Sequence, residues 1–253
     1  MSEQPLAPEA RSAQPEGAVA WYGKLPSLGD FVGRRMPHAL STEWDTWLRS
    51  GMDELRALNS TTWPEKFVTA PLWFFAVPAA VTGTAVIGAL APSMDRVGRY
   101  YPLTVMATAP HATSSLADDA RVRVFLSGAR AAIVEARRLT LSPEELDQRL
   151  SHLASPFESA SATPREPSLI DNILADLSEA SYAHQAADER VQLPRGDWRN
   201  RTARGSENSL WWVTPTPRWG YDEHVHRGVL DRSLFAHLFM KQPPSSEPHV
   251  SPL

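Results

Sequence analysis

The sequence predicts an α/β protein in which a mixed β-sheet lies between helix layers, a three-layer α/β/α sandwich. Short apolar runs of strand length alternate with segments whose apolar residues recur every three or four positions. This mixture favours a helix-covered sheet over a helical bundle or a β-sandwich. The chain has 253 residues, 42% of them hydrophobic and nine of them tryptophan, which is enough for a sizeable core. We therefore expect a single compact domain.

The two ends of the chain differ in composition from the rest. Residues 1–17 and 242–253 are rich in proline and polar residues and have no periodic apolar face, so they are predicted to be flexible tails around a domain at 18–241.

The first twenty residues lack the basic start and apolar run of a secretory signal. The chain has no cysteine, which fits a reducing compartment, and we expect a cytoplasmic protein.

The first predicted element is a short strand, AVAWY at 18–22, which leads into a turn region between Gly23 and Gly29. A helix follows, because apolar residues recur at spacings of three and four. Ser41 or Thr42 is placed to cap its first turn. The apolar stripe of this helix consists of Trp44, Trp47, Leu48, Met52 and Leu55.

Three apolar segments of strand length come next, at 72–77, 84–90 and 101–108, and their short connections make them neighbours in one sheet. No charged residue occurs from Ala70 through Met94, a stretch long enough on paper to cross a bilayer. Its three prolines and a Thr-Gly-Thr turn at 82–84 favour two buried strands. An interfacial or spanning segment is the alternative.

The rest of the chain is predicted to add helices and one more strand. A long helical pattern covers Asp119–Arg138, and Ser142, Pro143 and Glu145 form a capping box that starts the next helix. Residues 154–168 are small, polar and proline-rich, so we expect a surface loop or internal linker there. After it we expect a helix at 169–177, a strand at 209–213 and a closing helix that carries Leu234, Phe235, Leu238 and Phe239.

The composition and the absence of known motifs argue against several classes of function. A net charge of −4 gives no large positive field for nucleic acid. The sequence has no phosphate-binding loop, no dinucleotide fingerprint and no Gly-x-Ser-x-Gly elbow. Asp222, His224, His226 and His237 could be considered as metal ligands, but their spacing is not that of a closed zinc site. No metal and no cofactor is therefore predicted.

Two segments combine a turn with an aspartate, cations and aromatic residues. The first is GKLPSLGDF at 23–31, which two arginines follow closely, and the second is PSMDRVGRYYPL at 92–103. We call them the first and the second motif. Their candidate functional residues are Lys24, Asp30, Arg34, Arg35, Asp95, Arg96 and Arg99.

The sequence supports two interpretations of these residues. In one, rigid turns present arginine and aromatic side chains to a partner protein, and the arginines could also suit a phosphorylated peptide. In the other, Asp30 and Asp95 accept amides in their own turns, and Asp30 and Arg99 bridge the two turns. No nucleophile paired with a base accompanies the motifs, so we expect no enzyme; a hydrolase that uses Asp30, Asp95 and a histidine is the enzymatic alternative.

The two motifs resemble those of the TagF family, which is associated with bacterial type VI secretion. The resemblance rests on GKLPSLGDFV, WDTWL at 44–48, PLWFF, PSMDRVGRYYPL and SLWW at 209–212, in this order. It is strongest over 21–108 and looser in the second half. The first motif has Leu28 where the family usually has a basic residue.

The resemblance implies a regulator: TagF proteins are cytoplasmic, post-translational repressors of type VI secretion assembly. In some systems the repression acts through the forkhead-associated scaffold protein Fha, so Fha is the expected partner. The resemblance also implies a compact α/β domain with a sheet between helix layers. A structural accessory subunit of the secretion apparatus is the main alternative function.

Overall fold

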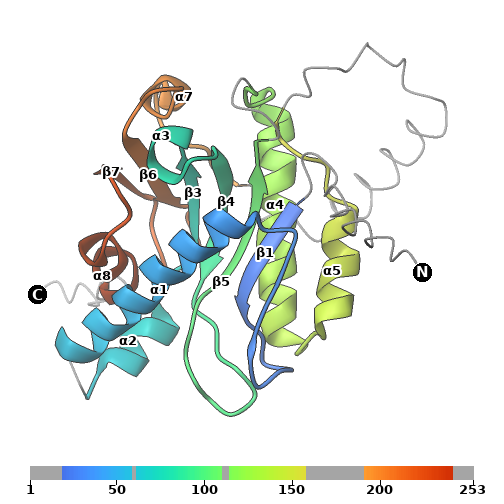
Figure 1. Cartoon of the computed structure of the whole chain (residues 1–253), viewed down its shortest axis with the longest axis vertical. Coiled ribbons are helices and arrows are strands. Elements are labelled where there is room, and N and C mark those ends of the chain that lie inside the picture. The colour runs from blue at the N-terminus through green and yellow to red at the C-terminus, as the bar shows by residue number, and fades with distance from the viewer. Residues whose placement is uncertain (1–18, 59–60, 110–113, 158–190, 242–253) are drawn as a thin grey trace, which may run out of the picture.

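The computed structural model describes residues 19–58, 61–109, 114–157 and 191–241. It contains one seven-stranded sheet with the order β2-β1-β5-β4-β3-β6-β7 (Figure 1). Its strands are β1 (Val19–Lys24), β2 (Phe31–Arg34), β3 (Trp73–Val77), β4 (Val86–Ala91), β5 (Leu103–Thr108), β6 (Asn208–Val213) and β7 (Asp222–Arg227). The predicted α/β class is confirmed. Where the sequence predicted a mixed sheet, every pairing among the described strands is antiparallel.

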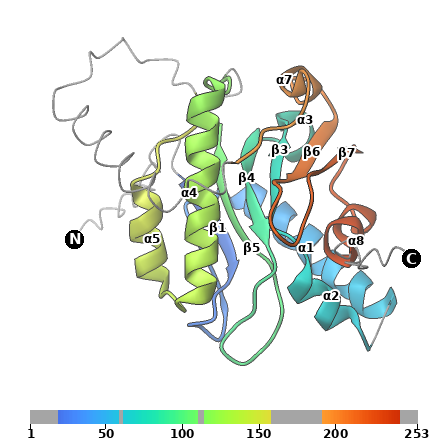
Figure 2. The same cartoon turned by 180° about the vertical axis from the view of Figure 1, so that it is seen from behind.

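Helices lie on both faces of the sheet (Figures 1 and 2). On one face are α1 (His38–Leu58), α2 (Trp63–Thr69) and α8 (Arg232–Met240), and on the other are α4 (Asp119–Arg138) and α5 (Pro143–Ser151). Two single-turn helices, α3 (Ala79–Thr82) and α7 (Trp198–Arg201), complete the described set. Strands from both halves of the chain therefore share one sheet.

The sheet has a core on each face because successive strand residues point to opposite sides. Trp212 packs in the core under α4 and α5, whereas its neighbour Trp211 packs in the core under α1 and α8. Both side chains are fully buried. Because helices cover both faces of the sheet, each face buries one of these two rings.

Of the two helix starts predicted from capping residues, that of α5 is confirmed and that of α1 is wrong. The capping box of α5 is present, because Ser142 Oγ accepts the Glu145 amide at 3.2 Å and the Glu145 carboxylate accepts the Ser142 amide at 2.7 Å. The predicted cap of the first helix is wrong: α1 already begins at His38. Ser41 and Thr42 lie inside the helix, where both hydroxyls donate back to the His38 carbonyl.

The uncharged stretch at 70–94 forms β3, α3 and β4, so the two buried strands are confirmed. The break between them is a helical turn that ends at Gly83, whose φ of 70° is left-handed. In the parts of the chain that the structure describes, no helix is long and apolar enough to cross a membrane. The predicted tails, the helix at 169–177 and most of the loop at 154–168 lie outside the described residues.

Five elements were not predicted: β2, α2, α3, α7 and β7. The strands β2 and β7 form the two edges of the sheet and are only partly buried, so they have no continuous apolar run. The helix α2 has only seven residues and a single buried side chain, Phe67. Such short elements give little hydrophobic periodicity to detect.

Candidate functional site

The two motifs form neighbouring loops at one end of the sheet (Figure 1). The first motif joins β1 to β2 and the second joins β4 to β5. Because β1 pairs with β5, the loops leave the sheet side by side. The Arg96 amide donates to the Leu28 carbonyl at 2.8 Å, and Ser93 Oγ donates to the Lys24 carbonyl at 2.8 Å. One backbone and one side-chain hydrogen bond therefore tie the two loops together.

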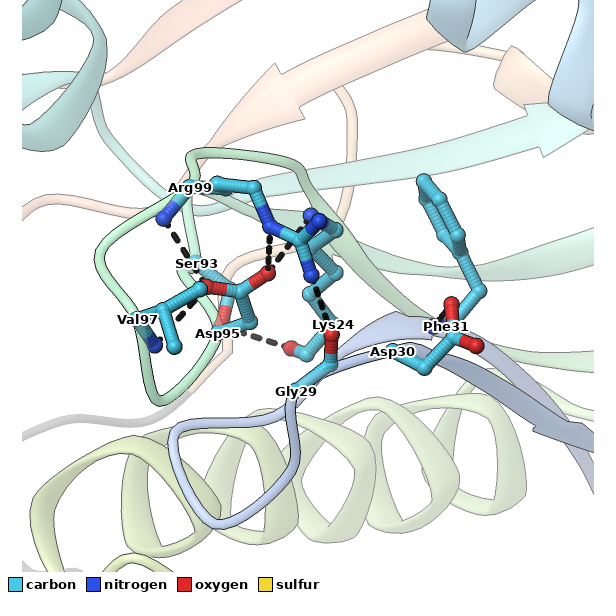
Figure 3. Close-up of polar contacts among 8 residues, drawn as sticks. All are labelled: Lys24, Gly29, Asp30, Phe31, Ser93, Asp95, Val97 and Arg99. Atoms are coloured by element: carbon cyan, nitrogen blue, oxygen red, sulfur yellow. Dashed lines mark hydrogen bonds and ion pairs between the residues drawn. The ribbon is translucent and has the colours of Figure 1, made fainter.

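Asp95 is the centre of the polar contacts between the loops (Figure 3). Its Oδ2 accepts from Lys24 Nζ and from Arg99 Nε, both at 2.7 Å. Its Oδ1 accepts the amides of Val97 at 3.0 Å and Arg99 at 2.9 Å. The Arg99 guanidinium also donates to the Gly29 carbonyl of the first motif. We call Lys24, Asp95 and Arg99 the ionic lock.

The ionic lock is buried on one side and open on the other. The Lys24 and Asp95 side chains are 6% and 0% exposed, whereas that of Arg99 is 60% exposed. Burial alone would raise the pKa of the Asp95 carboxyl, but the hydrogen bonds from Lys24 and Arg99 hold that pKa well below its ordinary value. The carboxylate is therefore charged at neutral pH and faces two cations.

The structural interpretation of the motifs needs one correction. Asp95 accepts amides in its own turn as expected, and Arg99 does bridge the two turns, but Asp30 takes no part in the bridge. The Asp30 carboxylate is exposed and accepts only the neighbouring Phe31 amide, at 2.7 Å, within the described residues. The acid that joins the two motifs is Asp95, and its partner in the first motif is Lys24.

The side chains of the other predicted arginines take no part in the ionic lock. Arg35 has a left-handed φ of 58° and binds the Val19 carbonyl and the Asp147 carboxylate of α5, at 2.7 and 2.8 Å, so it fastens β2 to the domain. Arg34 is half-exposed, with Glu144 at 3.7 Å, a surface pair of small energetic value. The Arg96 side chain is exposed at the tip of the second motif.

A second polar cluster, which the sequence analysis missed, is centred on Asp45 of α1. Its carboxylate accepts the hydroxyls of Tyr22 and Tyr101 at 2.5 and 2.7 Å and pairs with Arg49 at 2.5 Å. Burial, with the bond to Asp45, raises the pKa of Tyr22 to about 12 and raises that of Tyr101 as well. The sequence does contain a pattern that indicates a polar face on this helix. Charged residues recur every three or four positions beside the apolar stripe, at Asp45, Arg49, Asp53 and Arg56.

The Asp45 cluster predicts a loss of stability in acid. Burial opposes ionisation of Asp45, but the donors Tyr22, Tyr101 and Arg49 outweigh it and lower the pKa of this carboxyl below 3.8. A lowered pKa stabilises the native state above the unfolded-state value, and this contribution is lost as the pH falls below it. We expect Asp45→Asn to flatten the decline in the free energy of unfolding between about pH 5 and 3. Urea titrations at several pH values measure this, and parallel curves for the two proteins would contradict it.

A pocket of about 500 Å³ lies between the motif loops and the helices α1 and α2. It is lined by cations and by aromatic rings, among them Lys24, Arg56, Arg99, Phe31, Trp63 and Tyr100. We call it the Arg99 pocket. Several cations lie over ring faces, with 4.6 Å from the Arg49 guanidinium to the Phe31 centroid and 5.4 Å from Arg56 to Trp63.

Comparisons with known proteins agree with the family resemblance of the two motifs. The family model of the TagF N-terminal domain, type VI secretion system-associated, matches residues 20–153, which include both motifs. The crystal structure of PA0076 from Pseudomonas aeruginosa PAO1 is similar, with a TM-score of 0.61 and 26% identity over 93% of this chain and 98% of that chain. No curated protein matches the sequence. The family match covers more than half of the chain, which therefore belongs to the TagF N-terminal domain family of type VI secretion system-associated proteins.

Proposed function

We propose that the protein is a non-enzymatic, cytoplasmic regulator that represses the assembly of the type VI secretion system after translation, by binding a scaffold component such as Fha. The family supports the association with type VI secretion. The observation that carries the proposal is the ionic lock, because it fixes both family motifs into one surface beside an exposed loop tip.

The loop tip has the composition of a protein-binding surface. Arg96 is exposed, and the apolar side chains of Val97 and Met94 are 65% and 38% exposed. Arginine next to apolar side chains is typical of interface anchors. Since Asp95 holds the backbone of the loop through the amides of Val97 and Arg99, binding would cost little conformational entropy.

The geometry of the motif acids favours a regulator over the hydrolase alternative. A general base must be free to accept a proton from a substrate or water. The Asp95 carboxylate already accepts four hydrogen bonds and has a lowered pKa. Within the described residues, neither Asp95 nor Asp30 forms a hydrogen bond with a histidine, and no group of three or more acids and histidines is placed to hold a metal ion.

The test is a deletion and complementation assay that scores secretion of a type VI effector, combined with a pull-down of Fha by the tagged protein. A repressor predicts more secretion after deletion and less after overexpression. A structural subunit predicts the opposite response to deletion and co-purification in stoichiometric, salt-resistant assemblies. Unchanged secretion in both directions would refute the repressor function.

The loop tip gives a more specific prediction. We expect Arg96→Ala to weaken Fha binding at least about tenfold, because arginine is enriched among the few interface residues whose truncation costs about 1.4 kcal/mol or more. The matched control is Arg204→Ala, since Arg204 is also an exposed loop arginine, between α7 and β6. Both variants should unfold like the unchanged protein. Equal binding by both in calorimetry would show that the loop tip is not the contact surface.

A further inference from the structure

The Arg99 pocket holds more positive than negative charge. Lys24 and Arg99 share the single carboxylate of Asp95. The other two cations of the pocket have one acid each: Arg49 pairs with Asp45, and Arg56 pairs with Asp53. Four cations therefore face three carboxylates, which leaves one positive charge uncompensated.

The uncompensated charge is accessible at Arg99. Its side chain is 60% exposed, and it uses Nε for Asp95 and Nη2 for the Gly29 carbonyl. No hydrogen bond from Nη1 occurs within the described residues, so one nitrogen of the guanidinium remains available to a ligand. A guanidinium held at two nitrogens is already oriented, which lowers the entropy cost of binding an anion.

The walls beside this charge are aromatic. The Trp63 and Tyr100 rings meet edge to face at a centroid distance of 5.5 Å, and both are only partly buried. Phe31 is also partly buried and packs against Tyr101 at 4.7 Å. Half-exposed rings around a cation suit a ligand that combines an apolar side chain with a negative charge.

The size of the charge surplus distinguishes a carboxylate from a phosphate. A carboxylate carries one negative charge, which matches the single surplus, whereas a phosphorylated side chain carries roughly −1.5 to −2 at neutral pH. Asp53 also lines the pocket and would repel the additional charge. Arg49 and Arg56 would have to leave their own acids to compensate a phosphate.

We propose that the Arg99 pocket binds the carboxylate of a glutamate or aspartate, next to an apolar residue, in an acidic segment of the protein partner. The proposal rests on the proposed function for the identity of that partner as a secretion scaffold. It goes further by assigning the binding subsite and the chemistry of the group that enters it. The loop tip at Arg96 and the pocket would then contact neighbouring parts of the same partner.

A peptide titration tests the pocket without the scaffold. The probes are acetylated, amidated tripeptides Leu-Glu-Phe, Leu-Gln-Phe and Leu-phosphothreonine-Phe, added to the full ¹⁵N-labelled chain. The readout is the indole signal of Trp63, assigned with Trp63→Phe. We expect the glutamate peptide to shift this signal with a millimolar Kd that rises with salt, and the glutamine peptide to bind at least about tenfold more weakly. A phosphopeptide that binds tenfold more tightly than glutamate, equal binding by glutamine, or no shift would each overturn the proposal.

A pair of variants locates the site. Arg56→Ala removes a pocket cation whose side chain is 50% exposed and pairs with Asp53 one helical turn away. Arg123→Ala on α4 is the matched control, because Arg123 is 49% exposed and lies 3.9 Å from Asp119, also one turn away. We expect Arg56→Ala to weaken glutamate-peptide binding about three- to tenfold and Arg123→Ala to leave it unchanged. Equal Kd values for the two variants would overturn the assignment.

Pull-downs with Fha separate failure of the pocket from failure of the function. If the unchanged protein retains Fha and Arg56→Ala retains it equally, the pocket is not the subsite and the repressor function stands. Weaker retention by Arg56→Ala than by Arg123→Ala supports the pocket. If deletion leaves secretion unchanged and Fha does not bind, the proposed function fails; a positive titration then still supports a carboxylate subsite, for another partner.

Discussion

Replacing Asp95 with asparagine is expected to lower the free energy of unfolding by about 3–5 kcal/mol, the usual cost of removing one partner of a buried ion pair. Asparagine has nearly the same shape, so the change leaves no cavity. It leaves the Lys24 ammonium, whose side chain is only 6% exposed, without a counter-charge. The asparagine oxygen can accept some of the four former hydrogen bonds, but its amide group would face the cations with donors of its own.

Urea unfolding followed by tryptophan fluorescence measures the effect of Asp95→Asn. The matched control is Asp30→Asn in the first motif, where the carboxylate is exposed and accepts a single amide; we expect a change within about 0.5 kcal/mol. The double variant Lys24→Met with Asp95→Asn should recover part of the lost stability, because no buried charge is then left unpaired. If Asp95→Asn is as stable as Asp30→Asn, the ionic lock does not hold the loops together.

The parts of the fold that the sequence predicted are those with strong burial. The strands β3, β4 and β5 are buried at every position, so their apolar runs are visible in the sequence. The edge strand β7 reads DEHVHR and is only half-buried, because an edge strand has one neighbour and must avoid pairing with other chains. Its polar sequence therefore resembles a loop. The strands β1 and β5 pair although they lie far apart in the chain. Such a pairing leaves no local pattern in the sequence.

The candidate site, too, was predicted only in part. Sequence reasoning selected Lys24, Asp95 and Arg99, which the structure brings together. It assigned the bridge to Asp30 instead of Asp95, and this was wrong. Both aspartates lie near glycine, cations and aromatic residues in a turn, so residue type alone does not separate them. The choice between them depends on the register of β1 against β5, which places Gly23 opposite Leu103. The helical residues Arg49, Arg56 and Trp63 reach the pocket only through the packing of α1 and α2.

Gly23→Ala is expected to lower the free energy of unfolding by about 2–6 kcal/mol, from backbone strain of about 1–3 and overpacking of about 1–3. Gly23 has a φ of +146°, which L-residues rarely adopt. A Cβ there would lie 2.1 Å from the Pro102 carbonyl oxygen and 2.8 Å from the Leu103 Cα. Both atoms belong to the backbone, so no side chain can rotate away, and β1 would have to separate from β5.

Gly29→Ala is the matched control in the same motif, because a Cβ at Gly29 meets nothing within 4 Å. Thermal and urea unfolding of both variants, with circular dichroism to confirm the native fold, give the comparison. We expect Gly29→Ala to remain within about 0.5 kcal/mol of the unchanged protein. Equal stability of the two variants would mean that the first motif does not need its close approach to Pro102. A large loss at Gly23 alone would instead show that this glycine serves the contact between the two motifs, whatever partner their shared surface binds.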